Sequence, residues 1–295
     1  MILKKATYLL IILLSSTLWS LESVSAASKP GAEDSLVVGI FPRRNAKVTV
    51  KMFTPLANYL SAQTGKNIRL ATAKNFPTFW KNVMKNKYDI VHYNQLHYIE
   101  SNAKLGYQVI AKNEEFGAGT IRGGLAVRKD SGVNSVKDLR GATILFGGGK
   151  KAFISYVVNS VTLHRAGLGK YGYVTKFAKN PPNATIATFI KQADAAGIGD
   201  VGLKIPILKK KGVKVSELKL VGVSKPYPHL PWAVTKSMDS KQRQLIQNAM
   251  LSLNGSSEGR KILKRAGLTG LKKATDKDYD STREIIDEFK MINKN

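Results

Sequence analysis

Short apolar segments with the spacing of β-strands alternate with segments of helical spacing along most of this chain. The first strands are predicted at Leu36–Phe41, Ile68–Ala71 and Asp89–His92, each followed by a helical stretch. Strands that alternate with helices favour a parallel or mostly parallel sheet with helices on both faces. The same pattern starts again near Lys129, with a strand at Ala142–Phe146, and the last third of the chain carries strands that return toward the first unit. We therefore predict an α/β fold of two units.

The N-terminal residues have the three-part layout of a secretory signal peptide. Lys4 and Lys5 precede an apolar run from Ala6 to Leu18, and small residues follow at Ser23–Ala27. The run is shorter than the ~20 apolar residues that span a bilayer. We expect residues 1–26 to be removed. The sequence contains no cysteine, which excludes disulfides, thiolate metal sites and a lipid-anchor cysteine, so we expect a free periplasmic protein.

The chain is strongly basic, with 47 Lys and Arg against 20 Asp and Glu and a formal net charge of +27. Such a balance favours association with anions. The lysines are spread along the whole chain, and no arginine-rich tail is present. We therefore expect a small anionic solute and no nucleic acid as the partner. A separate role for the basic surface stays open.

A glycine-rich turn follows the strand that ends at Phe146. Gly147-Gly148-Gly149-Lys150-Lys151 leads into a predicted helix over Ala152–Ala166. Backbone N–H groups and the positive end of a helix dipole would then point to one place, which suits a small anion. We expect Gly148, Gly149, Lys150 and Lys151 to contact such a ligand. The alternative is an ordinary turn with solvated lysines.

Polar side chains also follow the other predicted strands. In open α/β sheets the ligand lies beyond the carboxyl ends of the strands, and two such units facing each other form a cleft. The alternatives are that Tyr93 packs in the core, that the histidines are satisfied polar residues and that the arginine is solvated. The candidate ligand contacts from these strand ends are Arg43, His92, Tyr93, His97, Asp200 and His229.

No catalytic constellation is recognisable. The chain lacks a Gly-x-Ser-x-Gly elbow, and its glycine turn departs from the nucleotide-binding P-loop. The spacing of His92 and His97 does not match a zinc site. We predict no catalytic residue, no metal and no cofactor. An exported metal-dependent hydrolase is the less favoured alternative.

Four segments together resemble the phosphonate-binding periplasmic proteins, which are the substrate-binding components of phosphate, phosphite and phosphonate ABC transporters. Two of them are Val38-Gly-Ile-Phe-Pro42 and Lys87–Tyr98, which carries Tyr93 as the ligand-facing tyrosine of the family. The other two are the turn Phe146–Gly149 and the acidic segment Gln192–Asp200. The resemblance implies a two-lobed periplasmic binding protein of type II, with a mixed, mostly parallel sheet and flanking helices in each lobe.

The resemblance also implies lobe boundaries and a mechanism. Lobe one would comprise residues 35–128 plus 225–295 and lobe two residues 129–224, with crossings near Val127–Asp130 and Val223–Pro226. A phosphate-like or phosphonate-like anion would bind in the cleft, and the hinge would then close. The protein would act as a monomer and deliver the ligand to a membrane ABC permease. The same closure serves sensory binding proteins that signal to a membrane receptor. Phe153 and Ile154 depart from the family, because hydroxyl side chains are expected there.

Overall fold

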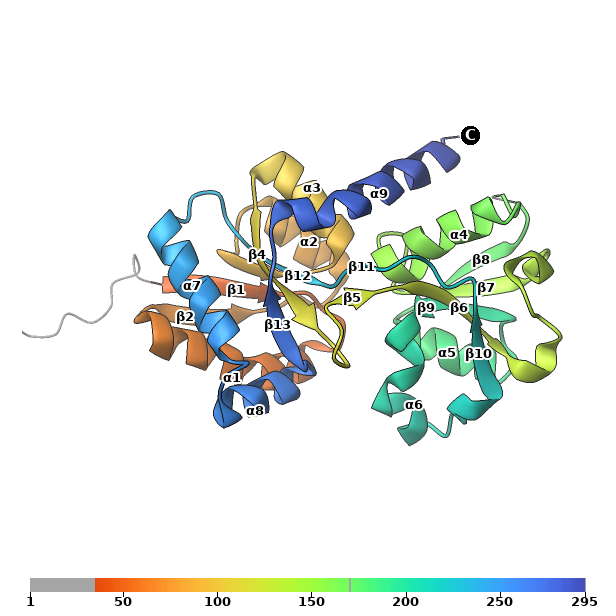
Figure 1. Cartoon of the computed structure of the whole chain (residues 1–295), viewed down its shortest axis with the longest axis horizontal. Helices are drawn as coiled ribbons and strands as arrows, with labels where there is room; N and C mark the ends of the chain where they lie inside the picture. The colour runs from red at the N-terminus through yellow and green to blue at the C-terminus, as the bar shows by residue number, and fades with distance from the viewer. Residues whose placement is uncertain (1–34, 170, 295) are drawn as a thin grey trace, which may run out of the picture.

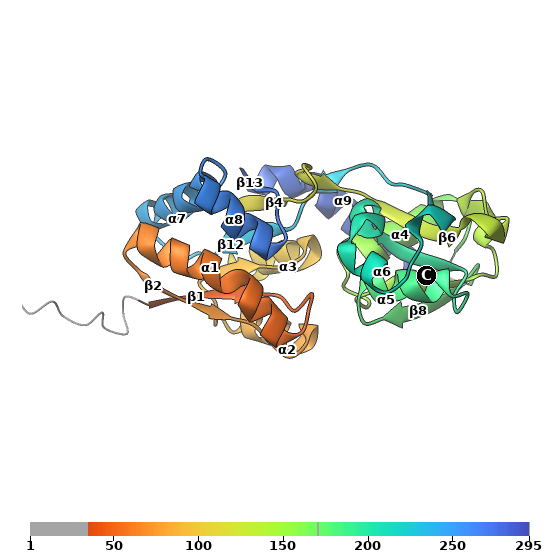
Figure 2. The ribbon, with the colours of Figure 1, turned by 90° about the horizontal axis from the view of Figure 1, so that it is seen from below.

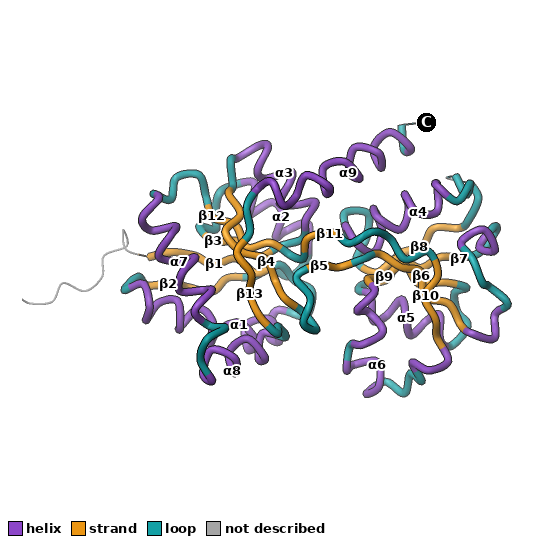
Figure 3. Tube along the Cα trace, viewed as in Figure 1, coloured by secondary structure: helices purple, strands orange, loops and turns teal. Residues whose placement is uncertain are grey.

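The chain forms two α/β lobes joined by a narrow connection (Figure 1). The computed structural model describes residues 35–169 and 171–294, so the predicted signal peptide lies outside the described residues. Helices cover both faces of each central sheet (Figure 3). Among the described residues, the helices are too short or too polar to cross a membrane. The predicted two-lobed fold with mixed sheets is confirmed.

Lobe one is built on a sheet with the strand order β13-β4-β12-β3-β1-β2. Strand β1 pairs in parallel with β2 and β3, whereas β12, supplied by the returning chain, is antiparallel to β3 and β4. The strands are β1 (Ser35–Ile40), β2 (Asn67–Ala71), β3 (Ile90–His92), β4 (Gln108–Glu114), β12 (Pro231–Val234) and β13 (Gly270–Lys273). The helices are α1 (Ala46–Thr64), α2 (Phe76–Met84), α3 (Gln95–Leu105), α7 (Ser240–Ser252) and α8 (Ser257–Ala266).

Lobe two has the strand order β10-β6-β9-β7-β8, in which β7 is parallel to β8 and β9, and β6 is antiparallel to its neighbours β9 and β10. Its strands are β6 (Gly123–Arg128), β7 (Thr143–Gly147), β8 (Val174–Ala178), β9 (Ala195–Gly199) and β10 (Leu218–Val221). Its α-helices are α4 (Asn159–Arg165), α5 (Pro181–Phe189) and α6 (Pro206–Lys210). A π-helix, η4 (Phe153–Val158), precedes α4. Short 3₁₀ turns lie at η2 (Lys129–Ser131), η3 (Val136–Leu139), η5 (Asp200–Lys204), η6 (Val215–Glu217) and, in lobe one, η7 (Asp276–Tyr279).

Two short antiparallel strands, β5 (Thr120–Ile121) and β11 (Tyr227–Pro228), connect the lobes. The first crossing lies at β5 and therefore earlier than predicted near Val127–Asp130, because β6 pairs with β9 and β10 in the second sheet. Gly123, at the start of β6, packs tightly against lobe two, because a Cβ on it would lie 2.7 Å from Val158. The second passage lies between β10 and β11.

The last helix, α9 (Asp280–Ile292), starts on lobe one and extends over lobe two (Figures 1 and 2). Ile285 and Ile286 share one apolar cluster with Leu96 of lobe one and with Val157 and Val161 of lobe two. Two hydrogen bonds, of 2.8 and 2.5 Å, join the Arg165 guanidinium of lobe two to Glu288. Helix α9 therefore belongs to both lobes, whereas the sequence placed it in lobe one alone.

Candidate functional site

Strand β1 points toward lobe two, and the segments after β1, β4 and β11 meet where the lobes join (Figure 1). Here a buried carboxylate, Glu115, lies at the centre of a chain of hydrogen bonds. Arg43 Nη1 donates to Glu115 Oε1 at 2.9 Å, and Asn113 Nδ2 donates to the same oxygen at 3.1 Å. Trp232 Nε1 donates in turn to Asn113 Oδ1 at 2.8 Å. This chain fixes the position of the carboxylate and of the guanidinium.

The electrostatics of this corner keep Glu115 ionised. Burial alone would raise the pKa of its carboxyl, but the charge of Arg43 and the hydrogen bonds from Arg43 and Asn113 outweigh burial and lower the pKa to about 2. Arg43 keeps 44% of its side chain exposed, against 8% for Glu115. The predicted site residue Arg43 is therefore held by a carboxylate and still reaches solvent.

His229 lies beside Glu115 and is fully buried. Burial lowers the pKa of its imidazole to about 4, so the ring is neutral at physiological pH. The Leu230 N–H donates to His229 Nδ1 at 2.8 Å, and the proton of the neutral ring therefore sits on Nε2. Nε2 has no hydrogen-bond partner and lies 3.9 Å from Glu115 Oε2. A buried donor is thus left without an acceptor.

His92 and Tyr93 lie in the interior of lobe one, and His92 adjoins the corner that holds Arg43, Glu115 and His229. His92 stacks on Trp232 with 4.2 Å between ring centroids, and its Nδ1 lies 3.0 Å from the Pro231 carbonyl oxygen. Burial lowers the pKa of His92 to about 3. The Tyr93 hydroxyl lies 2.7 Å from Ser101 Oγ, and its ring has no exposed surface. The ligand-facing position predicted for Tyr93 needs correction: apolar packing holds it in the core.

The glycine turn of lobe two rests on lobe one. Gly148 and Gly149 adopt φ values of 101° and 91°, which L side chains rarely adopt. Asn94 Nδ2, at the start of α3, donates to the Lys151 carbonyl oxygen at 3.0 Å. Lys151 Nζ lies 2.8 Å from Glu100 of α3. The turn therefore meets the segment that contains Tyr93, but through Asn94 and Glu100.

The helix predicted to follow the glycine turn starts as the π-helix η4, not as an α-helix. Phe153 and Ile154, which stand where hydroxyl groups were expected, are 1% and 9% exposed and pack in the apolar cluster under α9. Ser155 Oγ donates to the Gly147 carbonyl oxygen at 2.5 Å and closes the base of the turn. The Gly148 N–H also donates within lobe two, to the Ala178 carbonyl oxygen at 2.9 Å, so both this amide and the nearby hydroxyl are engaged.

His97 and Asp200 complete the predicted set. The His97 ring stacks on Trp80 at 4.7 Å between centroids, and its buried Nδ1 has no hydrogen-bond partner. Burial and the neighbouring Lys151 lower the pKa of His97 to about 3. Asp200 Oδ1 accepts from the backbone N–H groups of Arg122 and Val201 at 3.2 and 2.9 Å. Among the described residues, no group of three or more His, Asp or Glu side chains is arranged to hold a metal ion.

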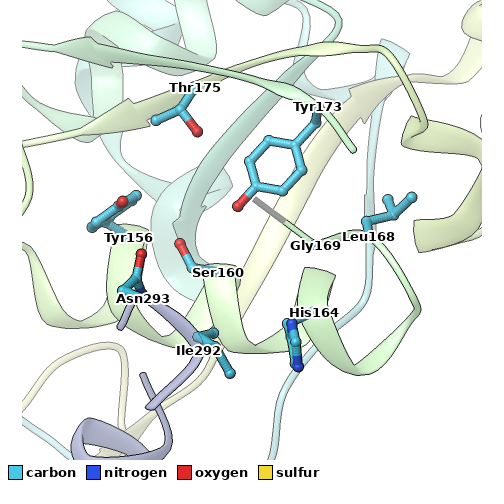
Figure 4. Close-up of a pocket in the computed structure, with 9 residues that line it drawn as sticks. All are labelled: Tyr156, Ser160, His164, Leu168, Gly169, Tyr173, Thr175, Ile292 and Asn293. Atoms are coloured by element: carbon cyan, nitrogen blue, oxygen red, sulfur yellow. The ribbon is translucent and has the colours of Figure 1, made fainter. Parts of the chain in front are cut away.

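A separate cavity of about 40 Å³ lies in lobe two under the end of α9 (Figure 4). The hydroxyls of Tyr156, Ser160 and Tyr173 point into it, and Asn293 closes it from α9. Burial raises the pKa of both tyrosines, which therefore stay protonated. The volume has room for a few water molecules. This cavity contains none of the residues predicted to bind a ligand.

Two sheets joined by a pair of crossing strands, with polar side chains at the junction, define a two-lobed periplasmic binding protein. A family model for the periplasmic substrate-binding proteins of phosphonate ABC transporters matches residues 38–279, and the chain belongs to this family. The predicted family is thus confirmed. Its members are periplasmic binding components of transporters and not enzymes.

Solved structures share this fold at low sequence identity. A binding component of a phosphonate ABC transporter from Pseudomonas aeruginosa gives a TM-score of 0.75 at 17% identity over 88% of this chain and 87% of its own. PhnD1 from Prochlorococcus marinus, in complex with methylphosphonate, gives 0.75 at 17% identity over 87% and 98%. The aliphatic sulphonate binding protein SsuA from Escherichia coli gives 0.62 at 13% identity over 88% and 87%. The fold alone does not choose between these ligands.

Several residues of this junction escaped the sequence interpretation. Glu115, Asn113 and Trp80 carry much of its geometry, yet none of them belongs to a recognisable motif. The available signal was weak: Glu114-Glu115 comes two residues after the strand predicted at Tyr107–Ala111, in a chain with few acidic residues. A carboxylate at a strand end in such a basic chain is a reason to look for a buried cation beside it.

Proposed function

We propose that this protein captures a small tetrahedral oxyanion of the phosphate or phosphonate class between its lobes and delivers it to a membrane ABC permease. The observation that carries the proposal is the donor set at the junction. Lobe one offers the Arg43 guanidinium and the unpartnered Nε2–H of His229. Lobe two offers the turn from Gly148 to Lys151, whose glycines let a ligand approach the backbone closely. A few charge-assisted hydrogen bonds of this kind supply micromolar affinity.

Hinge motion about β5 and β11 would open and close this site. The interlobe contacts at Asn94, Lys151 and Glu100 are polar, and Lys151 and Glu100 are partly exposed, so breaking these contacts costs little. The apolar cluster under α9, which both lobes share, is the contact that resists opening more strongly. A ligand that contacts both lobes binds the closed form more tightly and shifts the population toward it. We propose that the monomeric closed form is the one that the permease receives.

Isothermal titration calorimetry with methylphosphonate, phosphite and phosphate tests this function. We expect at least one of these anions to bind the purified protein with micromolar or better affinity. Arg43→Gln is expected to weaken that binding at least tenfold. Arg260→Gln, which changes an exposed arginine of α8, serves as the matched control and is expected to leave binding unchanged. The proposal fails if none of the three anions binds, or if the two variants behave alike.

A further inference from the structure

We propose that Glu115 and His229 form a subsite for a protonated oxygen of the bound acid. This subsite would select oxyanions that keep an O–H group, such as hydrogen phosphate and hydrogen phosphonates, over sulfate and sulfonates, which have none near neutral pH. The inference rests on the proposed function, because it names the feature by which that same site would choose its ligand.

Glu115 and His229 face each other in lobe one without a direct hydrogen bond between them. His229 Nε2 and Glu115 Oε2 are 3.9 Å apart, which is too far for a hydrogen bond. One oxygen atom placed about 2.8 Å from each would bridge them at normal hydrogen-bond length. Such an oxygen would also give the buried Nε2–H the acceptor that it lacks. Leaving a buried donor unpaired is costly, so a hydrogen bond from Nε2–H to a ligand oxygen would be favourable.

The protons decide what the occupant can be. His229 presents a hydrogen at Nε2, because its Nδ1 accepts from the Leu230 N–H. Glu115 presents a lone pair, because its carboxyl is ionised. The bridging oxygen must therefore accept one hydrogen bond and donate another. A P–OH oxygen does both, whereas a sulfonate oxygen would face the bare carboxylate without a proton between them.

The surroundings hold this pair firmly. Asn113 and Arg43 both donate to Oε1 of Glu115, which leaves Oε2 as the oxygen directed at His229. Trp232 fixes Asn113 from β12. Glu115 pairs with Arg43, and Arg44 lies close enough to feel the charges of both residues.

Calorimetry with two matched ligand pairs tests the subsite: methylphosphonate against methanesulfonate, and phosphate against sulfate. We first identify which of the two pairs the wild-type protein binds better. Within that pair, we expect the phosphorus acid to bind at least 100-fold more tightly than its sulfur counterpart. Glu115→Gln gives this position an amide that can donate as well as accept. We expect this change to reduce the preference to less than tenfold.

Controls separate the subsite from the fold and from the proposed function. Glu114→Gln changes the neighbouring carboxylate, which pairs with Lys272 at 3.1 Å, and is expected to keep the full preference.

If no oxyanion binds the wild type, the proposed function itself fails. If wild type binds both members of a pair within threefold, the subsite is refuted while oxyanion capture stands, and this measurement needs no variant to fold. An unchanged preference in a folded Glu115→Gln protein refutes the subsite equally. If Glu114→Gln also lost the preference for the phosphorus acid, that preference would not originate at Glu115, and the result would count against the subsite.

Discussion

The two lobes bring polar groups to the same junction by opposite means. Lobe one uses buried side chains: Glu115 is 8% exposed, and His229 is fully enclosed. Lobe two uses backbone: Gly148 and Gly149 shape a turn whose Lys151 side chain remains 50% exposed. Charges in the lobe one corner act at short range with little screening, whereas the lysines of the turn are screened by water and salt. We therefore expect lobe one to respond to protonation, and lobe two to backbone changes and ionic strength.

Acid should destabilise lobe one most. His92, His97 and His229 are buried there, with pKa values lowered to about 3, 3 and 4, against ~6.5 in the unfolded chain. The unfolded state binds more protons in this window, so stability falls as pH drops below ~6.5. At pH 5 each imidazole costs about 2 kcal/mol. Glu115 stays ionised there because its pKa is about 2. Urea unfolding at pH 7.5 and pH 5 measures the loss.

An equal free energy of unfolding at these two pH values would show that the histidines are hydrated and not enclosed. His97→Gln provides the matched variant, since it keeps a polar side chain but removes one titrating group. Between pH 7.5 and pH 5, the free energy of unfolding of this variant is expected to fall by about 2 kcal/mol less than that of wild type.

Two glycine substitutions should separate packing from backbone conformation in the turn of lobe two. A Cβ on Gly147 would lie 2.4 Å from the backbone of Pro181, which cannot move aside. Gly147→Ala should therefore lower the free energy of unfolding by roughly 3 kcal/mol. Gly149 has open space around it and only a positive φ, so Gly149→Ala should cost about 1 kcal/mol. Chemical denaturation compares the two; equal losses would contradict the different origins.

Tyr93→Phe should show that this residue is part of the core. Removing the hydroxyl breaks the contact with Ser101 and should cost about 1 kcal/mol of stability. Because the ring lies away from the junction, oxyanion affinity should remain within twofold of wild type by calorimetry. A tenfold loss of affinity in a protein of normal stability would return Tyr93 to the ligand site.

Lys151→Gln should have the smallest effect on stability. The Lys151–Glu100 pair is partly exposed and is expected to contribute less than about 1 kcal/mol. The loss should shrink further in 0.5 M salt, whereas the Glu115 corner should show no such dependence. Lys150→Gln, at the neighbouring exposed lysine, is the control for net charge. Identical effects of the two changes would mean that the ion pair contributes nothing.

The parts of this molecule that repeat along the sequence were predictable, and those made by distant segments were not. Alternating strands and helices identified both lobes, because periodicity reports local burial. Strand β6 was assigned to the wrong sheet, because the sequence of a buried apolar strand such as Gly123–Arg128 does not indicate which strands it pairs with. The sequence left Tyr93 open between the ligand site and the core for a related reason: its hydroxyl partner, Ser101, lies on the next helix, and nothing in the motif shows which way the ring turns. Glu115 depends on Arg43, 72 positions away, and on Trp232, so only the folded chain reveals it.

Helix α9 gives the end of the chain an importance beyond its length. Residues 280–292 cover apolar side chains of the second lobe such as Val157 and Val161. Before this helix docks, the second lobe exposes an apolar surface of the kind that chaperones bind. A truncated product that stops near Tyr279 would retain both sheets and still be prone to aggregate.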